Sequence, residues 1–187
     1  RNGVVLGEGA VLFFIEKSES AKTRGAQIYC SIESLIQETS WSRKCRGAKS
    51  KIRSIEKLND SLSKLAQGRF STVKAIDSGA NSSPLKDYIE GKVISYLCAN
   101  NHLDAQVTSI KSILGESLSA SGAMQLLGLT YMLNSGRVYP CLSYESKDPK
   151  IDLKNINTNS TKRKIDAALA INVGLGYPTY MLHCRKN

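Results

Sequence analysis

The chain has 187 residues, of which 41% are hydrophobic and 22% charged, and it carries a formal net charge of +10. This length and composition predict one soluble domain with a sizeable core. The longest apolar run, Ala10 to Ile15, is far shorter than the roughly 18 residues of a membrane helix, and no basic-then-apolar leader opens the chain. We therefore expect a cytoplasmic protein without a membrane segment.

Apolar periodicity and turn residues divide the chain into strands and helices. Continuous apolar residues within 3–16 predict a turn followed by a strand buried on both faces. Apolar positions at intervals of three and four predict an amphipathic helix over 51–67, ended by Gly68. Further strands are expected at 27–36, 72–77, 105–109, 167–173 and 179–184, and further helices at 18–24, 85–97 and 119–134. Residues 146–164 are polar and are expected to form a surface excursion.

Cysteine and histidine residues give no sign of a metal or redox site. Five cysteines are dispersed along the chain: Cys30, Cys45, Cys98, Cys141 and Cys184. Because no C-x-x-C spacing occurs among them, we expect them to be reduced and structural. The histidines, His102 and His183, lack the spacing of metal ligands or of a general base. The sequence therefore predicts no bound metal and no cofactor.

Positive charge is densest between Arg43 and Lys57, where Glu56 is the one acidic residue. Such a field attracts acidic partners, and its strength depends on salt. The stretch lacks interleaved aromatic residues, and no helix-turn-helix or zinc-finger spacing appears, so nucleic acid is not the expected partner. A solvated helical face and a docking surface for an acidic protein both remain open. The candidate docking residues are Arg43, Lys44, Arg46, Lys49, Lys51 and Arg53.

Two stretches carry the strongest local signals. The first, Ile76 to Glu90, has the sequence IDSGANSSPLKDYIE, and the second, Thr108 to Leu127, has the sequence TSIKSILGESLSASGAMQLL. In the second stretch Lys111 precedes a glycine turn and a helix that begins with small residues. Small residues allow close backbone approach, and the free N–H groups at a helix N-terminus favour anionic or carbonyl oxygens. A site beside this helix is therefore predicted.

Both stretches resemble the C-terminal half of the β-ketoacyl synthases, the condensing enzymes of fatty acid and polyketide synthesis. The family pattern K-S-x-x-G-H-x-x-x-A-x-G-A is similar to residues 111–123, except that the histidine is replaced. The pattern V-N-A-H-G-T-x-T-P-x-x-D-x-x-E falls in step with the first stretch when Pro84 sets the register. The family's G-E-G-A is reproduced at residues 7–10.

The resemblance implies an α/β domain that is the C-terminal half of a thiolase-like fold. Its expected core is a mixed five-stranded sheet with helices on both faces. Residues 1–16 correspond to the last strand of the family's N-terminal half, and residues 27–187 correspond to the C-terminal half. Residues 1–187 are thus expected to form a single ketosynthase-like C-terminal domain.

The same resemblance implies a degenerate active site at Gly79, Lys111 and Glu116. Gly79 and Glu116 stand where the family has its two catalytic histidines, whereas Lys111 is retained and could form a buried pair with Glu116. Histidine donors stabilise the enolate and thioester oxyanions, which neither a bare hydrogen nor a carboxylate can do. The family's oxyanion turn corresponds here to Gly174, Gly176, Tyr177 and Pro178. The bulk of this tyrosine and the missing proline N–H argue against a working oxyanion contact.

Such losses are typical of chain-length factors, the inactive partners of ketosynthases in type II polyketide systems. The sequence therefore favours a non-catalytic subunit, not an enzyme by itself, of a type II polyketide synthase or a related polyene or fatty acid synthase. It would form a heterodimer with an active ketosynthase and help to shape the polyketide tunnel. Other expected partners are a separate or cleaved N-terminal half and an acidic acyl carrier protein.

Two alternatives remain open. One is a ketosynthase-like decarboxylase or acyltransferase in which Glu116 acts as a base. The other is a scaffold that docks an acyl carrier protein without affecting chain length. Neither nucleic acid nor a membrane is an expected partner.

Overall fold

The computed structural model describes residues 3–39, 55–62, 64, 68–142, 144–174 and 178–187. Its centre is a five-stranded mixed sheet with the strand order β1-β7-β6-β2-β3. The strands are β1 (Ser31–Glu38), β2 (Val73–Ser78), β3 (Gln106–Thr108), β6 (Ala167–Asn172) and β7 (Thr179–Arg185). β6, β2 and β3 are parallel neighbours, whereas β7 lies antiparallel to both β6 and β1.

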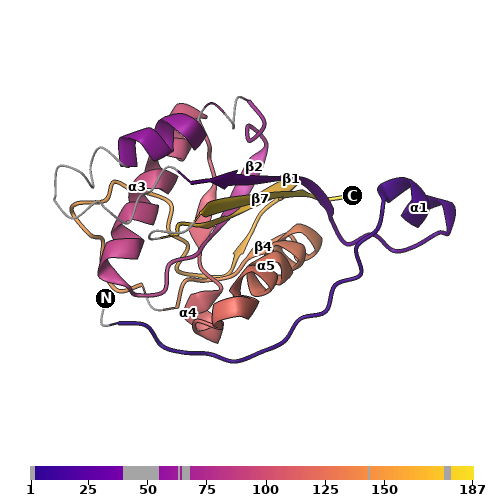
Figure 1. Ribbon diagram of the computed structural model, residues 1–187, viewed down its shortest axis with the longest axis horizontal. Coiled ribbons are helices and arrows are strands. Elements are labelled where there is room, and N and C mark those ends of the chain that lie inside the picture. Colours follow the sequence, from indigo (N-terminus) through magenta and orange to yellow (C-terminus); the bar gives the residue numbers. More distant parts are fainter. Residues whose placement is uncertain (1–2, 40–54, 63, 65–67, 143, 175–177) are drawn as a thin grey trace.

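Helices cover both faces of this sheet (Figure 1). The helices include α1 (Ser18–Thr23), α3 (Pro84–Asn100), α4 (Lys111–Leu114), η1 (Leu118–Ala120) and α5 (Ser121–Ser135), of which α1 does not lie against the sheet. α3 and the helical residues 55–62 pack on one face, and α5 packs on the other. These layers confirm the predicted fold class. None of the helices among the described residues is long and apolar enough to cross a membrane.

The two faces of the sheet carry side chains of different size because successive residues of a strand point to opposite faces. On the α3 face the central strands present branched residues such as Ile76, Leu169 and Ile171. On the α5 face the same strands present the alanines Ala75, Ala168 and Ala170. Since alanine adds little height, α5 can lie close to the sheet backbone.

Most of the predicted elements are present, with their ends shifted by a few residues. The strand expected at 27–36 begins later, at Ser31, and the last helix starts at Ser121 after the 3-10 turn η1. The part of the predicted helix 51–67 that the structure describes is helical at 55–62 and 64. Two elements were not predicted: the short helix α4 and a small antiparallel pair of strands, β4 (Arg137–Val138) and β5 (Thr161–Lys162).

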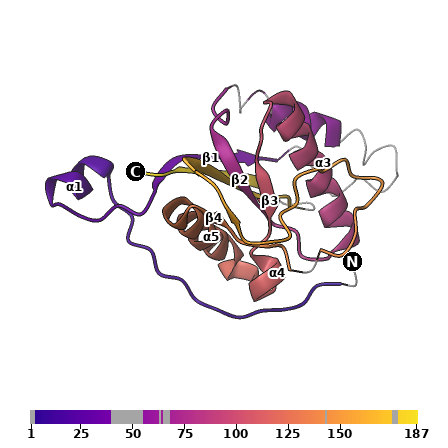
Figure 2. The same ribbon diagram turned by 180° about the vertical axis from the view of Figure 1, so that it is seen from behind.

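The strand predicted within residues 3–16 is not formed in this chain. That segment, here called the N-terminal arm, is extended and makes one isolated bridge, between Leu6 and Glu116. Figures 1 and 2 show the arm passing along the α4 and α5 side of the molecule and leading to α1, which projects from the body. Apolar side chains of the arm are exposed, including Leu12 at 97% and Phe14 at 83%. The apolar pattern was correctly identified, but it has no neighbouring strand within the described chain.

Candidate functional site

The candidate site lies at the carboxyl ends of the parallel strands β2 and β3, where binding sites of open α/β sheets are commonly built. The loop 79–83 follows β2, and α4 follows β3. A buried carboxylate joins the two loops, because Asp77 Oδ1 accepts a hydrogen bond of 2.8 Å from the Ile110 backbone N–H. Burial raises the pKa of Asp77 to about 7. The residues of both sequence motifs are thereby brought together.

Lys111 and Glu116 form a buried ion pair at this place. Lys111 Nζ lies 2.8 Å from Glu116 Oε2, and the two side chains are only 3% and 9% exposed. Asn81 Nδ2 donates to the same oxygen at 2.8 Å. Oε1 accepts hydrogen bonds from the Leu118 backbone N–H at 3.1 Å and from Ser121 Oγ. Both carboxylate oxygens are therefore occupied by donors of the protein itself.

These contacts fix the charge state of Glu116. Burial alone would raise its pKa, but hydrogen bonds from Lys111, Ser121 and Asn81 outweigh that effect and lower the pKa to about 2. The carboxylate is consequently ionised at neutral pH and is a weak base. It offers no hydrogen-bond donor to a bound molecule.

The N-terminal arm closes over the backbone of Glu116. The Glu116 N–H donates to the Val5 carbonyl at 2.8 Å, and the Gly7 N–H donates to the Glu116 carbonyl at 3.1 Å. A Cβ atom at Gly7 would lie 1.8 Å from the Leu114 carbonyl oxygen, so only glycine fits where the arm crosses the end of α4. The bridge thus ties the arm directly to the site.

Gly79 begins the loop after β2, the same loop that carries Asn81, a hydrogen-bond partner of Glu116. A Cβ atom placed there would meet the Cγ and Oδ1 atoms of Asn172 at 3.0 Å and its Cα atom at 3.1 Å. The space beside Gly79 is therefore partly filled by the end of β6. A larger side chain at this position would require Asn172 to move.

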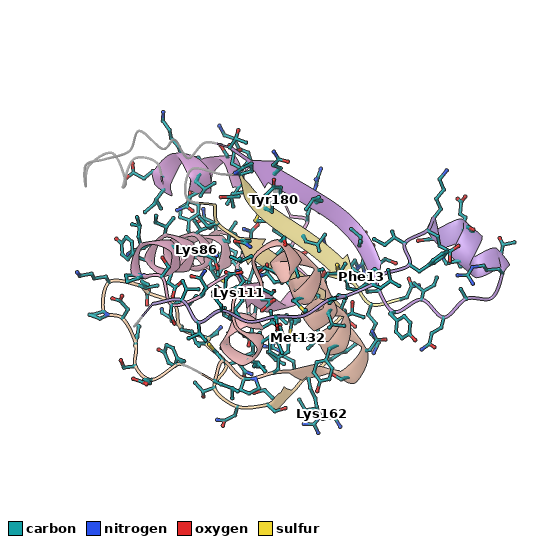
Figure 3. The ribbon with its side chains drawn as sticks, turned by 60° about the horizontal axis from the view of Figure 1, so that its bottom comes forward. Phe13, Lys86, Lys111, Met132, Lys162 and Tyr180 are labelled. Atoms are coloured by element: carbon teal, nitrogen blue, oxygen red, sulfur yellow. The ribbon has the colours of Figure 1, made fainter. Side chains whose placement is uncertain are left out.

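Lys86 is a site residue that sequence reasoning missed. It belongs to the first turn of α3, yet its Nζ atom reaches back and donates to the Gly79 carbonyl at 2.5 Å. Figure 3 shows Lys86 and Lys111 close together near the centre of the molecule. Burial lowers the pKa of Lys86 and the neighbouring Lys111 adds to this effect, whereas Glu90 and Glu116 oppose it. A lysine in the first turn of a helix also opposes the helix dipole.

The acidic residues of the first motif have structural contacts. Glu90 is fully buried and accepts from Ser78 Oγ at 2.5 Å and from the Val173 N–H at 2.8 Å. Asp87 accepts from the backbone N–H groups of Asn81 and Ser82, each at 3.1 Å. Asp87 therefore holds the loop 79–83 in place, and Glu90 joins the end of β2 to the residue that follows β6. The signal for Lys86 was present in the same motif, but its direction depends on the packing of α3 and cannot be obtained from spacing.

Two predicted groups fall wholly or partly outside the described residues. The docking candidates Arg43, Lys44, Arg46, Lys49, Lys51 and Arg53 lie in 40–54, which the structure does not describe. Of the predicted oxyanion turn, Gly174 and Pro178 are described, whereas Gly176 and Tyr177 are not. Both assignments stay predictions. Among the described residues no cluster of three or more histidine, cysteine or acidic side chains could hold a metal ion.

The five-stranded mixed sheet, the helices on both faces and the paired loops after β2 and β3 define a thiolase-like α/β domain. A family model described as "Beta-ketoacyl synthase, C-terminal domain" matches residues 41–145, more than half of the chain. The chain therefore belongs to the β-ketoacyl synthase family through this C-terminal domain, as the motifs predicted.

Relatives of known name agree with this family. The chain is 26% identical over 176 residues to the tetracenomycin polyketide synthase ketoacyl synthase alpha subunit of Streptomyces glaucescens, covering 94% of this chain and 41% of the relative. It is 29% identical over 192 residues to 3-oxoacyl-acyl-carrier-protein synthase 2 of Synechocystis, covering 100% of this chain and 44% of the relative. The chain thus spans less than half the length of these relatives.

Solved structures also share the fold. A type II polyketide synthase acyl carrier protein in complex with its hexaketide-bound ketosynthase gives a TM-score of 0.80 at 26% identity, covering 100% of this chain and 46% of that one. The ishigamide ketosynthase/chain length factor gives a TM-score of 0.77 at 19% identity, covering 99% of this chain and 45% of that one. At this lower identity the second comparison supports the fold alone.

Proposed function

We propose that this chain is part of a non-catalytic, chain-length-factor-like subunit of a type II polyketide synthase or a related synthase. The observation that carries the proposal is that both carboxylate oxygens of Glu116 accept hydrogen bonds from the protein itself. At a position where the family pattern has a histidine donor, this chain has an acceptor whose two oxygens are bonded to Lys111, Asn81, Leu118 and Ser121. Stabilisation of a developing oxyanion needs donors aimed at it.

The alternative in which Glu116 serves as a base is disfavoured by the same geometry. General-base catalysis is most effective when the pKa lies near the working pH. The pKa of Glu116, lowered to about 2, is far below that range, and the carboxylate is shielded by its four donors. Removing a proton from a substrate would require this arrangement to be broken.

The proposed partners are an active ketosynthase subunit, an N-terminal half supplied as a separate or cleaved chain, and an acidic acyl carrier protein. The exposed apolar side chains of the N-terminal arm support a covering polypeptide, since large apolar patches usually mark interaction sites. The solved relative described as a ketosynthase in complex with its acyl carrier protein supports the third partner. Docking would use the basic residues Arg43, Lys44 and Arg46.

The test is Glu116→Gln in the complex reconstituted with its ketosynthase. Glutamine keeps the size of the side chain but removes its charge, so product formation should persist at near wild-type rate if Glu116 has only a structural role. If product formation fell tenfold or more while the complex stayed assembled, the result would instead support the alternative in which Glu116 acts as a base. Release of carbon dioxide from a malonyl thioester by the isolated chain would refute the proposal outright.

A further test concerns the carrier protein. Reversing the charges of Arg43, Lys44 and Arg46 should weaken carrier binding at low salt, because long-range attraction between a basic surface and an acidic protein is screened by salt. Reversal at Lys147, Lys150 and Lys154 is a matched control. Unchanged carrier affinity at low salt would exclude docking through this stretch.

A further inference from the structure

A histidine is enclosed on the α3 face of the sheet, where the edge strand β1 meets β7. His183 lies on β7 directly opposite Ser34 of β1, and only 5% of this histidine is exposed. Because side chains alternate along a strand, His183 points to the same face as Met181, which belongs to the apolar cluster beneath α3. Its ring meets the ring of Phe70 edge to face, with the centroids 5.3 Å apart. His183 is therefore packed into an apolar layer of the core.

This position leaves buried polar atoms without partners. The Nε2 atom of His183 and the Oγ atom of Ser34 are both buried, and neither finds a hydrogen-bond partner within the part of the chain that the structure describes. A neutral imidazole is tolerated in such a place far better than an imidazolium, which brings a full charge with it. Burial accordingly lowers the pKa of His183. The folded protein therefore disfavours the protonated ring.

The charged groups around His183 give an added proton little compensation. Glu33 of β1 favours the protonated ring and Arg185 of β7 opposes it, and burial outweighs both. On its other side β7 pairs with β6, which carries no charged residue. The charged side chains of the covering segments are exposed or bonded elsewhere: Glu56, Lys57, Asp60, Lys64 and Arg69 are exposed, and Glu90 of α3 accepts from Ser78 and Val173.

The strand ladder is interrupted at the same place. β1 pairs with β7 through Ile32 opposite Cys184 and Ser34 opposite His183, so Glu33 is an extra residue at a β-bulge. β1 is also an edge strand with a neighbour on one side only, and a single one of its residues is buried. Segments with few buried contacts open locally at low free energy. A charge placed on His183 would thus act on a part of the sheet that opens easily.

We propose that His183 is a proton-sensitive latch that holds the edge strand β1 on β7. While the imidazole is neutral, β1 stays docked. When the ring takes up a proton, states in which β1 has opened and the imidazolium reaches water become more favourable. Opening of β1 would uncover the backbone groups of β7, which could then pair with another strand.

The direction of the pH effect follows from the lowered pKa. In the unfolded chain the pKa of His183 returns to its ordinary value of 6.5, so the unfolded chain takes up the proton first as the pH falls. The destabilisation is therefore absent above pH 6.5, grows below it, and levels off once the folded protein is protonated as well. Asp77 acts in the opposite direction, because its pKa is raised to about 7.

The test is hydrogen exchange of the whole chain at pH 7 and pH 5, corrected for the intrinsic exchange rates. Protection of the β1 amides should fall by up to about tenfold for each unit by which folding lowers the pKa, while β2 amides change less. His183→Phe keeps a flat ring that cannot be protonated, so this loss of protection should disappear. His102→Asn, at the other histidine, is the matched control and should retain it. Comparison with His183→Phe also removes the contribution of Asp77.

Two results would overturn the proposal without any variant. One is equal protection of the β1 amides at both pH values in the wild-type protein. The other is a wild-type His183 ring whose NMR signals titrate at or above pH 6.5. If His183→Phe folds and loses β1 protection at pH 5 as the wild type does, the latch is likewise refuted.

Discussion

Under the proposed function, the buried pair of Lys111 and Glu116 has a structural role instead of a chemical one. In an interior of low dielectric, two opposite charges are tolerated when their geometry is good and their remaining hydrogen-bonding capacity is satisfied. Asn81 and Ser121 meet that need for the carboxylate. The site is therefore built to hold its own loops together.

Removing one partner should show this structural role. We expect Lys111→Met to destabilise the fold by on the order of 3 kcal/mol, because Glu116 would remain as an uncompensated buried charge. Lys154→Met is a suitable control, since its 3.9 Å contact with Asp152 joins two largely exposed side chains. Urea denaturation measures both changes, and equal effects of the two substitutions would contradict the assignment.

The pH dependence of stability follows from the pKa of Glu116. Its value in the folded protein is lowered from 4.5 to about 2, so its stabilising contribution is complete above roughly pH 4.5 and is lost as the pH falls toward 2. The difference in unfolding free energy between wild type and Glu116→Gln should therefore shrink within this window. Asp152→Asn, at an exposed carboxylate, should show a much smaller change in the same measurements.

Single residues also mark the limit of sequence-based prediction at this site. The pairing of Lys111 with Glu116 could be predicted because these two opposite charges stand only five residues apart in the motif. The contact of Lys86 with the Gly79 carbonyl could not, because it depends on how α3 is rotated against the sheet. Asn172, which limits the space at Gly79, comes from a strand more than ninety residues away, and no local pattern encodes that distance.

At the level of secondary structure, the N-terminal arm shows that an apolar sequence pattern is not enough to form a strand. Its continuous apolar residues have the composition of a buried strand, which is why a strand was predicted there. A strand also requires a neighbour with free backbone groups, and among the described residues the arm finds only the Glu116 backbone. The elements that were predicted well, such as α3 and β6, have their partners within the chain.

Docking of the N-terminal arm on α4 should depend more on Gly7 than on Gly9. We expect Gly7→Ala to displace the arm, at a cost of about 1–3 kcal/mol, because the new Cβ atom would overlap the rigid Leu114 carbonyl. Gly9→Ala is the matched control, since its Cβ atom would meet only the flexible end of Met124. Faster protease cleavage of the arm in Gly7→Ala, but not in Gly9→Ala, would support a specific contact at Gly7. Similar cleavage of both variants would argue against a specific contact at Gly7.

On the scale of the whole molecule, an exposed apolar arm and a formal net charge of +10 lead to different expectations about association. Apolar contact does not weaken as salt is added, whereas attraction to an acidic partner does. The two kinds of contact can therefore be separated by ionic strength alone.

We expect the isolated chain to associate in solution through the N-terminal arm. Substituting Leu12 and Phe14 by serine should increase the monomer fraction measured by light scattering, because both side chains are largely exposed and their loss should leave the core unchanged. The control is the same kind of substitution, Leu142→Ser, at an exposed leucine that is distant from the arm in sequence. A monodisperse monomer of the wild-type chain at micromolar concentration would contradict the expectation.

The alanine face of the sheet gives the core a direct influence on the site. α5 carries Ser121 at its first turn, and the height of this helix above the sheet is set by Ala75, Ala168 and Ala170. An added methyl or two at Ala168 would act as a wedge and lift the serine away from the Glu116 carboxylate. Substitution of these small interior residues would thus weaken the hydrogen bond between Ser121 and Glu116, although every polar residue of the site stayed the same.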